Sequence, residues 1–301
     1  MDGRRGYSTM NSRNLKIHAI NTGNVTIRPN QVEGKGAGPK RILNVYLDKK
    51  WTEALPIYAW AIEHPEGVVV VDTGETARTA ERGYFPRWHP YYMNVKTDVK
   101  PEEEIGPQLE DIGIKANEVR QVILTHMHTD HAGGLYHFPK SEVVIMKQAY
   151  DLARGFRGML RGFLPHRLPS WLSPTLIDLS NEGYGPFPKS LKMTKAGDII
   201  LVPTSGHTEA HISVILETPD IKYFFAGDTS YNQDLMLRGK IDGVSANAKD
   251  SYETIQNIQQ FTATEPAIYL PSHDPDSEKR LVNNDEVTVP TTLISGMRNL
   301  S

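Results

Sequence analysis

Three histidines and one aspartate lie within six residues of this sequence, at His126, His128, Asp130 and His131. Neutral imidazole nitrogens and carboxylate oxygens are the donors that a divalent metal such as zinc selects. Burying such groups without a partner would cost several kcal/mol, because they lose their solvation. We therefore interpret the cluster as part of a metal site rather than as a structural feature of the core.

Three further donor residues, His207, Asp228 and His273, each follow an apolar run elsewhere in the chain. Loops at the ends of sheet strands are where such folds collect their chemistry. Seven donors exceed what one tetrahedral zinc ion needs, which predicts two metal ions. Asp228 is the candidate bridge, because each oxygen of a carboxylate can bind one cation.

Short apolar runs predict the strands that position these donors. The run 122–124 precedes the first cluster, 198–202 precedes His207, 222–226 precedes Asp228, and 267–270 precedes His273. Similar patterns predict further strands at 15–27, 56–62, 68–71, 142–146 and 211–216, helices at 101–112, 147–153 and 251–261, and a loop at 29–40. The second and third of these strands are expected to form a hairpin. Strands with intervening helices in both halves favour an α/β fold.

No low-complexity linker divides the 301 residues, which favours a single domain over 15–301 preceded by a flexible N-terminal tail at 1–14. A lid insertion is expected around 154–172, where apolar side chains alternate with arginines. A lid over a pocket, a dimer contact and ordinary packing remain open for this segment. Membrane contact is the least favoured alternative, because three glycines weaken a helix there. The aromatic loop 84–92 is either a binding element or a packed surface loop.

Composition excludes several classes of function. The chain has 33 lysines and arginines against 36 aspartates and glutamates, with both signs interspersed. This balance supports neither nucleic-acid binding nor a polybasic membrane anchor. Cysteine is absent, so disulfides and thiolate ligands are excluded. Without an apolar run that could span a bilayer or serve as a signal peptide, a cytoplasmic protein is expected.

Four motifs together resemble the metallo-β-lactamase superfamily: Thr-His-x-His-x-Asp-His at 125–131, Gly-His-Thr at 206–208, Gly-Asp at 227–228 and Ser-His at 272–273. Val-Asp-Thr-Gly at 71–74 is similar to that family's early strand motif. The resemblance covers nearly the whole of 15–274 and implies a four-layer αβ/βα metallo-β-lactamase sandwich.

The resemblance also implies roles for individual residues. His126, His128 and His207 would bind one metal ion, and Asp130, His131 and His273 would bind the other, with Asp228 between them. Asp72 would orient the site loops by hydrogen bonding. The implied cofactors are two divalent ions, zinc first, with iron, manganese or cobalt as alternatives for a site without thiolates.

Two features resemble N-acyl homoserine lactone lactonases: Tyr231 lies three residues after Asp228, and the apolar segments 84–92 and 154–172 offer room for an acyl chain. This likeness implies a hydrolase that opens the lactone ring, the activity called quorum quenching. Water activated by the metals would attack the carbonyl carbon. Tyr231 would donate a hydrogen bond to the carbonyl oxygen, and Asp130 would carry a proton to the leaving alkoxide.

Other functions within this fold stay open. A glyoxalase II-like thioesterase shares all seven ligands, and other lactone or aryl-ester hydrolases would suit the same pocket. The commonest β-lactamases have an arginine where His131 stands and a cysteine near Asp228, and this chain has neither. A non-catalytic member is expected to lose ligands, and a phosphodiesterase needs cationic side chains for phosphate. The expected partner is a small lactone with an acyl chain, without nucleic acid or stable membrane insertion; a homodimer is left open.

Overall fold

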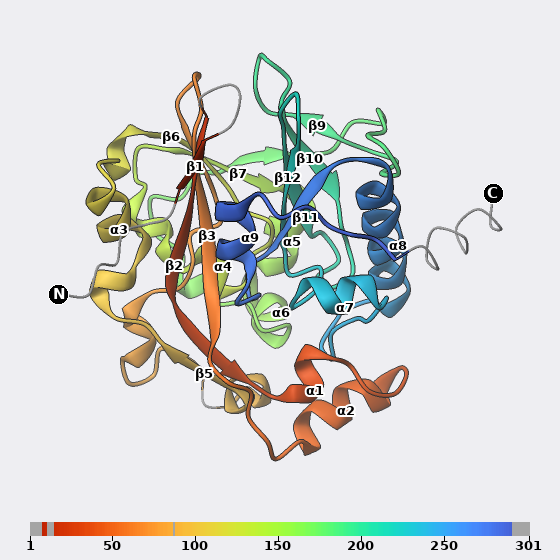
Figure 1. Ribbon diagram of the computed structural model, residues 1–301. Helices are drawn as coiled ribbons and strands as arrows, with labels where there is room; N and C mark the ends of the chain where they lie inside the picture. Colours follow the sequence, from red (N-terminus) through yellow and green to blue (C-terminus); the bar gives the residue numbers. More distant parts are fainter. Residues whose placement is uncertain (1–7, 11–14, 87, 291–301) are drawn as a thin grey trace. The chain divides into compact units, whose positions relative to one another are not determined.

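The computed structural model describes residues 8–10, 15–86 and 88–290, and each of its two compact units contains its own β-sheet (Figure 1). Unit 1 comprises Met1–Arg28 and Lys49–Ile177, and unit 2 comprises Pro29–Asp48 and Asp178–Ser301. The predicted α/β class is confirmed, since both units combine a sheet with helices.

Unit 1 contains an eight-stranded sheet in the order β1-β2-β3-β4-β6-β7-β8, with β5 paired to β2. The strands are β1 Ser8–Met10, β2 Lys16–Ile27, β3 Leu55–Glu63, β4 Val68–Val71, β5 Val95–Asp98, β6 Val119–Ile123, β7 Glu142–Met146 and β8 Thr175–Ile177. Strands β3 and β4 form the predicted antiparallel hairpin, and β4, β6, β7 and β8 run parallel. Val69, Val70 and Val71 are fully buried, as expected for a β-branched run in a parallel sheet.

The helices of unit 1 are short. They are α3 Ile105–Asp111, α4 Thr129–Ala132, α5 Lys147–Ala153 and α6 Gly155–Leu160, with 3₁₀ turns η1 Ala77–Ala80, η2 Pro90–Asn94, η3 Pro101–Glu103, η4 Ala116–Glu118, η5 Gly133–His137 and η6 Pro165–Arg167. The predicted helix 101–112 is divided into η3 and α3. Glu104 interrupts it with an extended backbone (φ −64°, ψ 155°), and its carboxylate accepts hydrogen bonds from the N–H of Ala77 and the hydroxyl of Thr76.

Unit 2 contains a five-stranded sheet in the order β13-β12-β11-β10-β9. Its elements are α1 Pro29–Val32, α2 Pro39–Leu47, β9 Leu191–Lys192, β10 Ile199–Pro203, β11 Ile212–Glu217, β12 Lys222–Gly227, α7 Gln233–Leu237, α8 Ala248–Thr264, β13 Ala267–Pro271 and α9 Ser277–Asn283. Strands β12 and β13 are parallel, and the other neighbours are antiparallel. Helix α8 packs Ile255, Ile258 and Phe261 into a core that includes Phe224 and Tyr269 from the sheet.

The predicted loop 29–40 is wrong in part, because α1 lies within it and α2 begins at its end. Pro39 stands in the first turn of α2, where its missing N–H costs no intrahelical bond. Within the predicted flexible tail 1–14, Ser8–Met10 pairs with β2, and the other residues of the tail lie outside the described residues. The single domain with a lid insertion stays a prediction. No helix in the described part of the chain is long and apolar enough to cross a bilayer.

Candidate metal centre

Four of the predicted donors lie in unit 1, in the segment that follows β6. Strand β6 ends at Ile123, five connecting residues follow, and α4 begins at Thr129 with His128 as its N-cap (φ −66°, ψ 157°). The connecting residues include His126 and His128, and the single turn of α4 carries Asp130 and His131. A strand end, a short connection and one helical turn thus carry four donors that span six positions in sequence.

Asp72 fixes the tautomers of two of these histidines. Its Oδ2 accepts hydrogen bonds from His131 Nδ1 at 2.8 Å and from the Thr125 hydroxyl at 2.8 Å, and its Oδ1 accepts the Thr125 N–H at 2.8 Å. Because the Thr125 hydroxyl donates to Asp72, it accepts from His126 Nδ1, 3.1 Å away. Both rings therefore carry their proton on Nδ1, which leaves the lone pair of Nε2 for a cation. Asp72 makes these bonds from a left-handed backbone (φ 57°) that few non-glycine residues adopt.

The donor atoms of unit 1 face one another at close range. His126 Nε2 lies 3.0 Å from His128 Nδ1, and His131 Nε2 lies 3.9 Å from Asp130 Oδ1. Two ligands of a tetrahedral zinc ion with bonds of about 2.0–2.2 Å are separated by about 3.3–3.6 Å. The two spacings fall on either side of that value, so the donor set fits a metal ion.

The other three donors lie in unit 2, where Asp228 stands between two imidazoles. Its Oδ2 lies 3.3 Å from His207 Nε2, and its Oδ1 lies 3.4 Å from His273 Nε2. The side chains of all three are at most 5% exposed. Each carboxylate oxygen thus pairs with a different histidine at the spacing expected of two ligands on one ion, which is the arrangement that a bridging aspartate requires.

Two residues that the sequence pattern did not single out hold this half of the site. Asp242 Oδ2 lies 3.3 Å from His207 Nδ1 and accepts the Ser245 hydroxyl at 2.5 Å. Burial alone would raise the pKa of Asp242, but the hydrogen bond from His207 and its other donors keep that pKa below its ordinary value. The ionised carboxylate orients His207 as Asp72 orients His131. His211 Nε2 accepts a hydrogen bond from the N–H of Asp228 at 3.1 Å.

Tyr231 lies beside this donor set, and its ring stacks on that of His273 with centroids 5.6 Å apart. Its hydroxyl oxygen accepts a hydrogen bond from the Gln31 amide at 3.0 Å. Gln31 belongs to α1, inside the segment predicted to be a loop, so no sequence signal pointed to it. Because the amide occupies a lone pair of the hydroxyl oxygen, the hydroxyl proton can be donated to another acceptor.

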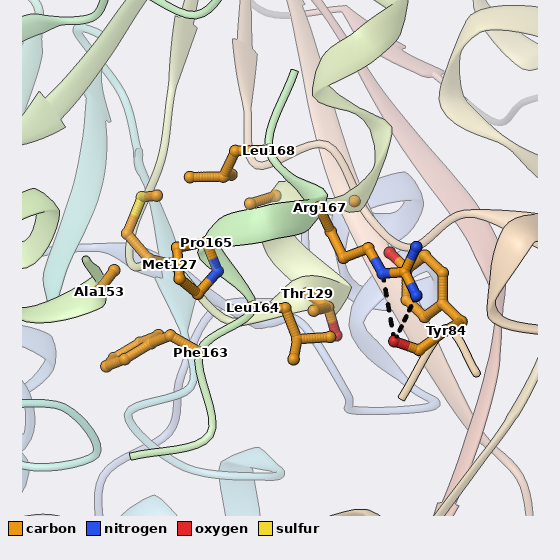
Figure 2. Close-up of a pocket in the computed structure, with 11 residues that line it drawn as sticks. Tyr84, Met127, Thr129, Ala153, Phe163, Leu164, Pro165, Arg167 and Leu168 are labelled. Carbon is orange, nitrogen blue, oxygen red and sulfur yellow. Dashed lines mark hydrogen bonds between the residues drawn. The ribbon is translucent and has the colours of Figure 1, made fainter. Parts of the chain in front are cut away.

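Two pockets of unit 1 adjoin the donor loop. The first is lined by His128, Thr129 and Asp130 together with Glu75, Phe85, Tyr92, Val25, Val95, Thr97 and Gly162. The second, shown in Figure 2, is mainly apolar, with Met127, Phe163, Leu164 and Leu168 around it, and the guanidinium of Arg167 donates to the Tyr84 carbonyl at its edge. Both predicted apolar segments, 84–92 and 154–172, therefore contribute to these pockets; within the first of them, Arg87 lies outside the described residues.

Glu75 is the one carboxyl group of the first pocket besides Asp130. Burial, and then the negative charge of Asp130, raise the pKa of Glu75 to about 8. At neutral pH the group is largely protonated, which explains how a carboxyl group without solvent exposure is tolerated beside Asp130. The pocket lining near the donors is therefore mostly neutral apart from Asp130.

Comparisons with known proteins bear on these donors. A family model described as the metallo-beta-lactamase superfamily matches residues 52–273. A probable metallo-hydrolase of Mycobacterium tuberculosis is 27% identical over 201 residues, which are 63% of this chain and 60% of that protein. The chain thus spans about 60% of the length of this relative. The N-acyl homoserine lactonase AttM of Rhizobium radiobacter is 23% identical over 233 residues, covering 74% of this chain and 83% of the relative.

Among solved structures, a mutant of B. thuringiensis AiiA with N-decanoyl-L-homoserine bound at its active site superimposes with a TM-score of 0.71. It is 19% identical and covers 90% of this chain and 98% of its own. The predicted fold class is therefore confirmed. Since the family model matches most of the chain, including the segments that carry all seven donors, the chain belongs to the metallo-beta-lactamase superfamily.

Proposed function

We propose that this chain is a metal-dependent hydrolase that opens the lactone ring of N-acyl homoserine lactones, the quorum-quenching reaction. Asp228 carries the proposal, because its two oxygens face two different imidazole nitrogens at 3.3 and 3.4 Å. A carboxylate in that arrangement suits a pair of cations, such as those that activate water in metal-dependent hydrolases. The names of the AttM relative and of other curated relatives as N-acyl homoserine lactonases support the same substrate class.

The proposed cofactors are two divalent metal ions, zinc first and iron, manganese or cobalt as alternatives. The proposed ligands of the first are His126, His128 and His207, and those of the second are Asp130, His131 and His273, with Asp228 shared. The lone pairs that Asp72 and Asp242 leave on Nε2 support this assignment. Bound there, such ions would polarise a carbonyl oxygen and lower the pKa of water toward neutrality.

Tyr231 and Asp130 are the side chains that we assign to oxyanion stabilisation and proton transfer. As the oxygen of water adds to the lactone carbonyl carbon, negative charge develops on the carbonyl oxygen, and the hydroxyl of Tyr231 donates a hydrogen bond to it. The ring carbon–oxygen bond then breaks. Asp130 takes the proton released from the water and delivers it to the departing alkoxide. The product is an acyl hydroxy acid, and no redox cofactor is required.

The acyl chain is assigned to the pocket lined by His128 and Asp130. Phe85, Tyr92 and Val95 supply its apolar lining. Burial of methylene groups against such a lining contributes about 0.8 kcal/mol each. Affinity should therefore rise with the length of the acyl chain until the pocket is filled.

A hydrolysis panel on metal-replete protein tests this function. The substrates are acyl homoserine lactones of increasing chain length, lactoylglutathione, aryl esters and phosphodiesters. We expect the highest kcat/KM with the acyl lactones. Faster hydrolysis of lactoylglutathione with inert lactones would replace the proposal with a thioesterase.

A pair of variants tests the metal dependence. Asp228→Asn should lose both hydrolysis and bound metal, because the amide cannot serve two cations. Asp198→Asn is the matched control, since Asp198 is a buried carboxylate outside the proposed ligand set that accepts a hydrogen bond from the Thr194 hydroxyl at 2.6 Å. Full activity of metal-free wild-type protein would end the proposal.

A further inference from the structure

An exposed apolar surface of unit 1 has no part in the proposed reaction. Trp88, Phe156 and Leu160 are 54%, 64% and 53% exposed, although side chains of this kind are usually covered. The rings of Trp88 and Phe156 stack with centroids 6.4 Å apart. Arg154 and Arg157 flank Phe156 and are exposed as well. We call these five residues the aromatic–arginine surface.

Several hydrogen bonds tie together the two segments that carry this surface. His89 Nε2 lies 3.1 Å from the Leu160 carbonyl, and the Tyr92 hydroxyl donates to the Gly162 carbonyl. Arg167 donates to the carbonyls of Gly83 and Tyr84. The segments around Trp88 and Phe156 are therefore one supported surface rather than two independent loops.

Helix α6 forms in spite of the glycines that argued against it. A Cβ on Gly158 would lie 2.2 Å from the Ala153 carbonyl oxygen, so glycine permits α6 to pack closely against the end of α5. The glycine thus serves packing and leaves Phe156 and Leu160, one turn apart, exposed on α6. The glycines therefore do not prevent a helix here, and they no longer argue against membrane contact.

The arginines on and next to α6 are exposed and carry positive charge. Arg154, Arg157 and Arg161 are exposed, the segment 152–177 contains no aspartate or glutamate, and Asp151, one turn before Arg154, is the acid nearest to them in sequence. A second copy of the chain would have to find acidic side chains for these arginines on its own surface. A surface that is cationic and also carries exposed tryptophan, phenylalanine and leucine matches an anionic bilayer, which offers phosphate charge and an apolar phase side by side.

We propose that the aromatic–arginine surface docks unit 1 onto an anionic phospholipid membrane, with Trp88, Phe156 and Leu160 inserted at the interface and Arg154 and Arg157 against the headgroups. Gly162, which is bonded to Tyr92 next to this surface, lines the pocket of His128 and Asp130. If the proposed function holds, an amphiphilic acyl lactone dissolved in the bilayer would reach that pocket over a short path. The docking itself does not depend on the reaction.

Co-sedimentation with vesicles tests the docking on the full chain. We expect binding to vesicles of phosphatidylcholine mixed with phosphatidylglycerol, little binding to phosphatidylcholine alone, and release at high salt. Arg157→Gln should lower the partition coefficient about fivefold, and Phe156→Ser about tenfold. Because vesicle binding requires no hydrolysis, a failed lactonase assay leaves this result intact, and the reverse also holds.

Matched variants on unit 2 separate this surface from general exposure. Tyr252 is 50% exposed between the acidic Asp250 and Glu253, and Arg238 is exposed but paired with Asp234. Tyr252→Ser and Arg238→Gln should bind vesicles as the wild type does. The docking is overturned if wild-type protein does not sediment with the anionic vesicles, or if Phe156→Ser and Arg157→Gln bind unchanged. A lipid-free dimer that Phe156→Ser converts to monomer would also overturn it, in favour of a second copy.

Discussion

Replacing Asp72 with asparagine should weaken metal binding without unfolding the protein. Asparagine tolerates the left-handed backbone that Asp72 adopts at φ 57°, so the turn after β4 is kept. The amide can replace only one acceptor oxygen. Its NH₂ group must face either the Thr125 N–H, or the Thr125 hydroxyl and His131 Nδ1, all of which donate to Asp72 at 2.8 Å.

The size of the effect follows from the tautomer of His131. Facing the amide NH₂, the ring is more stable with its proton on Nε2, which removes the lone pair that a metal ion would use. Binding the ion then costs one charge-assisted hydrogen bond, about 1.5–3 kcal/mol. This corresponds to a roughly 10- to 150-fold rise in the Kd for zinc, in line with about 10- to 100-fold for other outer ligands of metal sites.

Zinc titration of the apo protein against a chromophoric chelator measures that Kd, and nitrogen NMR of the apo protein reports which nitrogen of His131 carries the proton. Asp198→Asn is again the control, because it removes a buried carboxylate bonded to Thr194 and should leave zinc affinity unchanged. If Asp72→Asn binds zinc as tightly as the wild type, or if Asp198→Asn weakens binding equally, Asp72 does not support zinc binding through the tautomer of His131.

Three further predictions concern the site and its support. Tyr231→Phe should lower kcat/KM by about 1–3 kcal/mol of transition-state stabilisation with metal content unchanged, and Gln31→Leu should lower it less; steady-state kinetics with metal analysis would contradict this if either variant kept the wild-type rate. Glu104 has a pKa below its ordinary value, because hydrogen bonds from His137 and Ala77 outweigh its burial; its stabilisation is present above the unfolded pKa and is lost as pH falls through the folded one. Glu104→Gln should therefore cost about 1–2 kcal/mol of unfolding free energy in urea at pH 7 and less at pH 3, and an equal loss at both would refute a role for the ionised carboxylate. Chelating the metal should lower the Tm, by an amount equivalent to about 4 kcal/mol when free zinc is about a thousand times its Kd; an unchanged Tm would argue against a bound ion.

The strands that position the donors were predictable from the sequence because their signals are local. A run such as 68–71 or 122–124 carries enough β-branched and apolar residues to indicate a buried strand, and donor residues follow such runs directly. Helix α2 was missed because its start lies in a stretch rich in glycine, lysine and proline. Arg41 anchors this helix by donating to the carbonyls of Asp242 and Ser245, which are about 200 residues away in sequence.

The residues that support the donors were not predictable for the same reason. Asp242 follows no apolar strand and lies in the segment between α7 and α8, and Gln31 belongs to a four-residue helix without periodicity. Their roles depend on contacts with His207 and Tyr231, across 35 and 200 positions. Only Asp72 was anticipated, through a motif of the family rather than through a local pattern.

The parallel pairing of β12 and β13 has a consequence for how the protein matures. After a register shift between Phe225 and Gly227, Gly227 pairs with Pro271 and the Ser272 N–H donates to the Gly227 carbonyl, so the pairing fixes the strand ends that precede Asp228 and His273. Because a shift of one residue turns every side chain of a strand to the opposite face, a misaligned sheet would offer a cation the wrong neighbours. Uptake of a coloured ion such as cobalt should thus begin only after these strands align. The rise of cobalt absorbance during refolding would then report when this late step occurs.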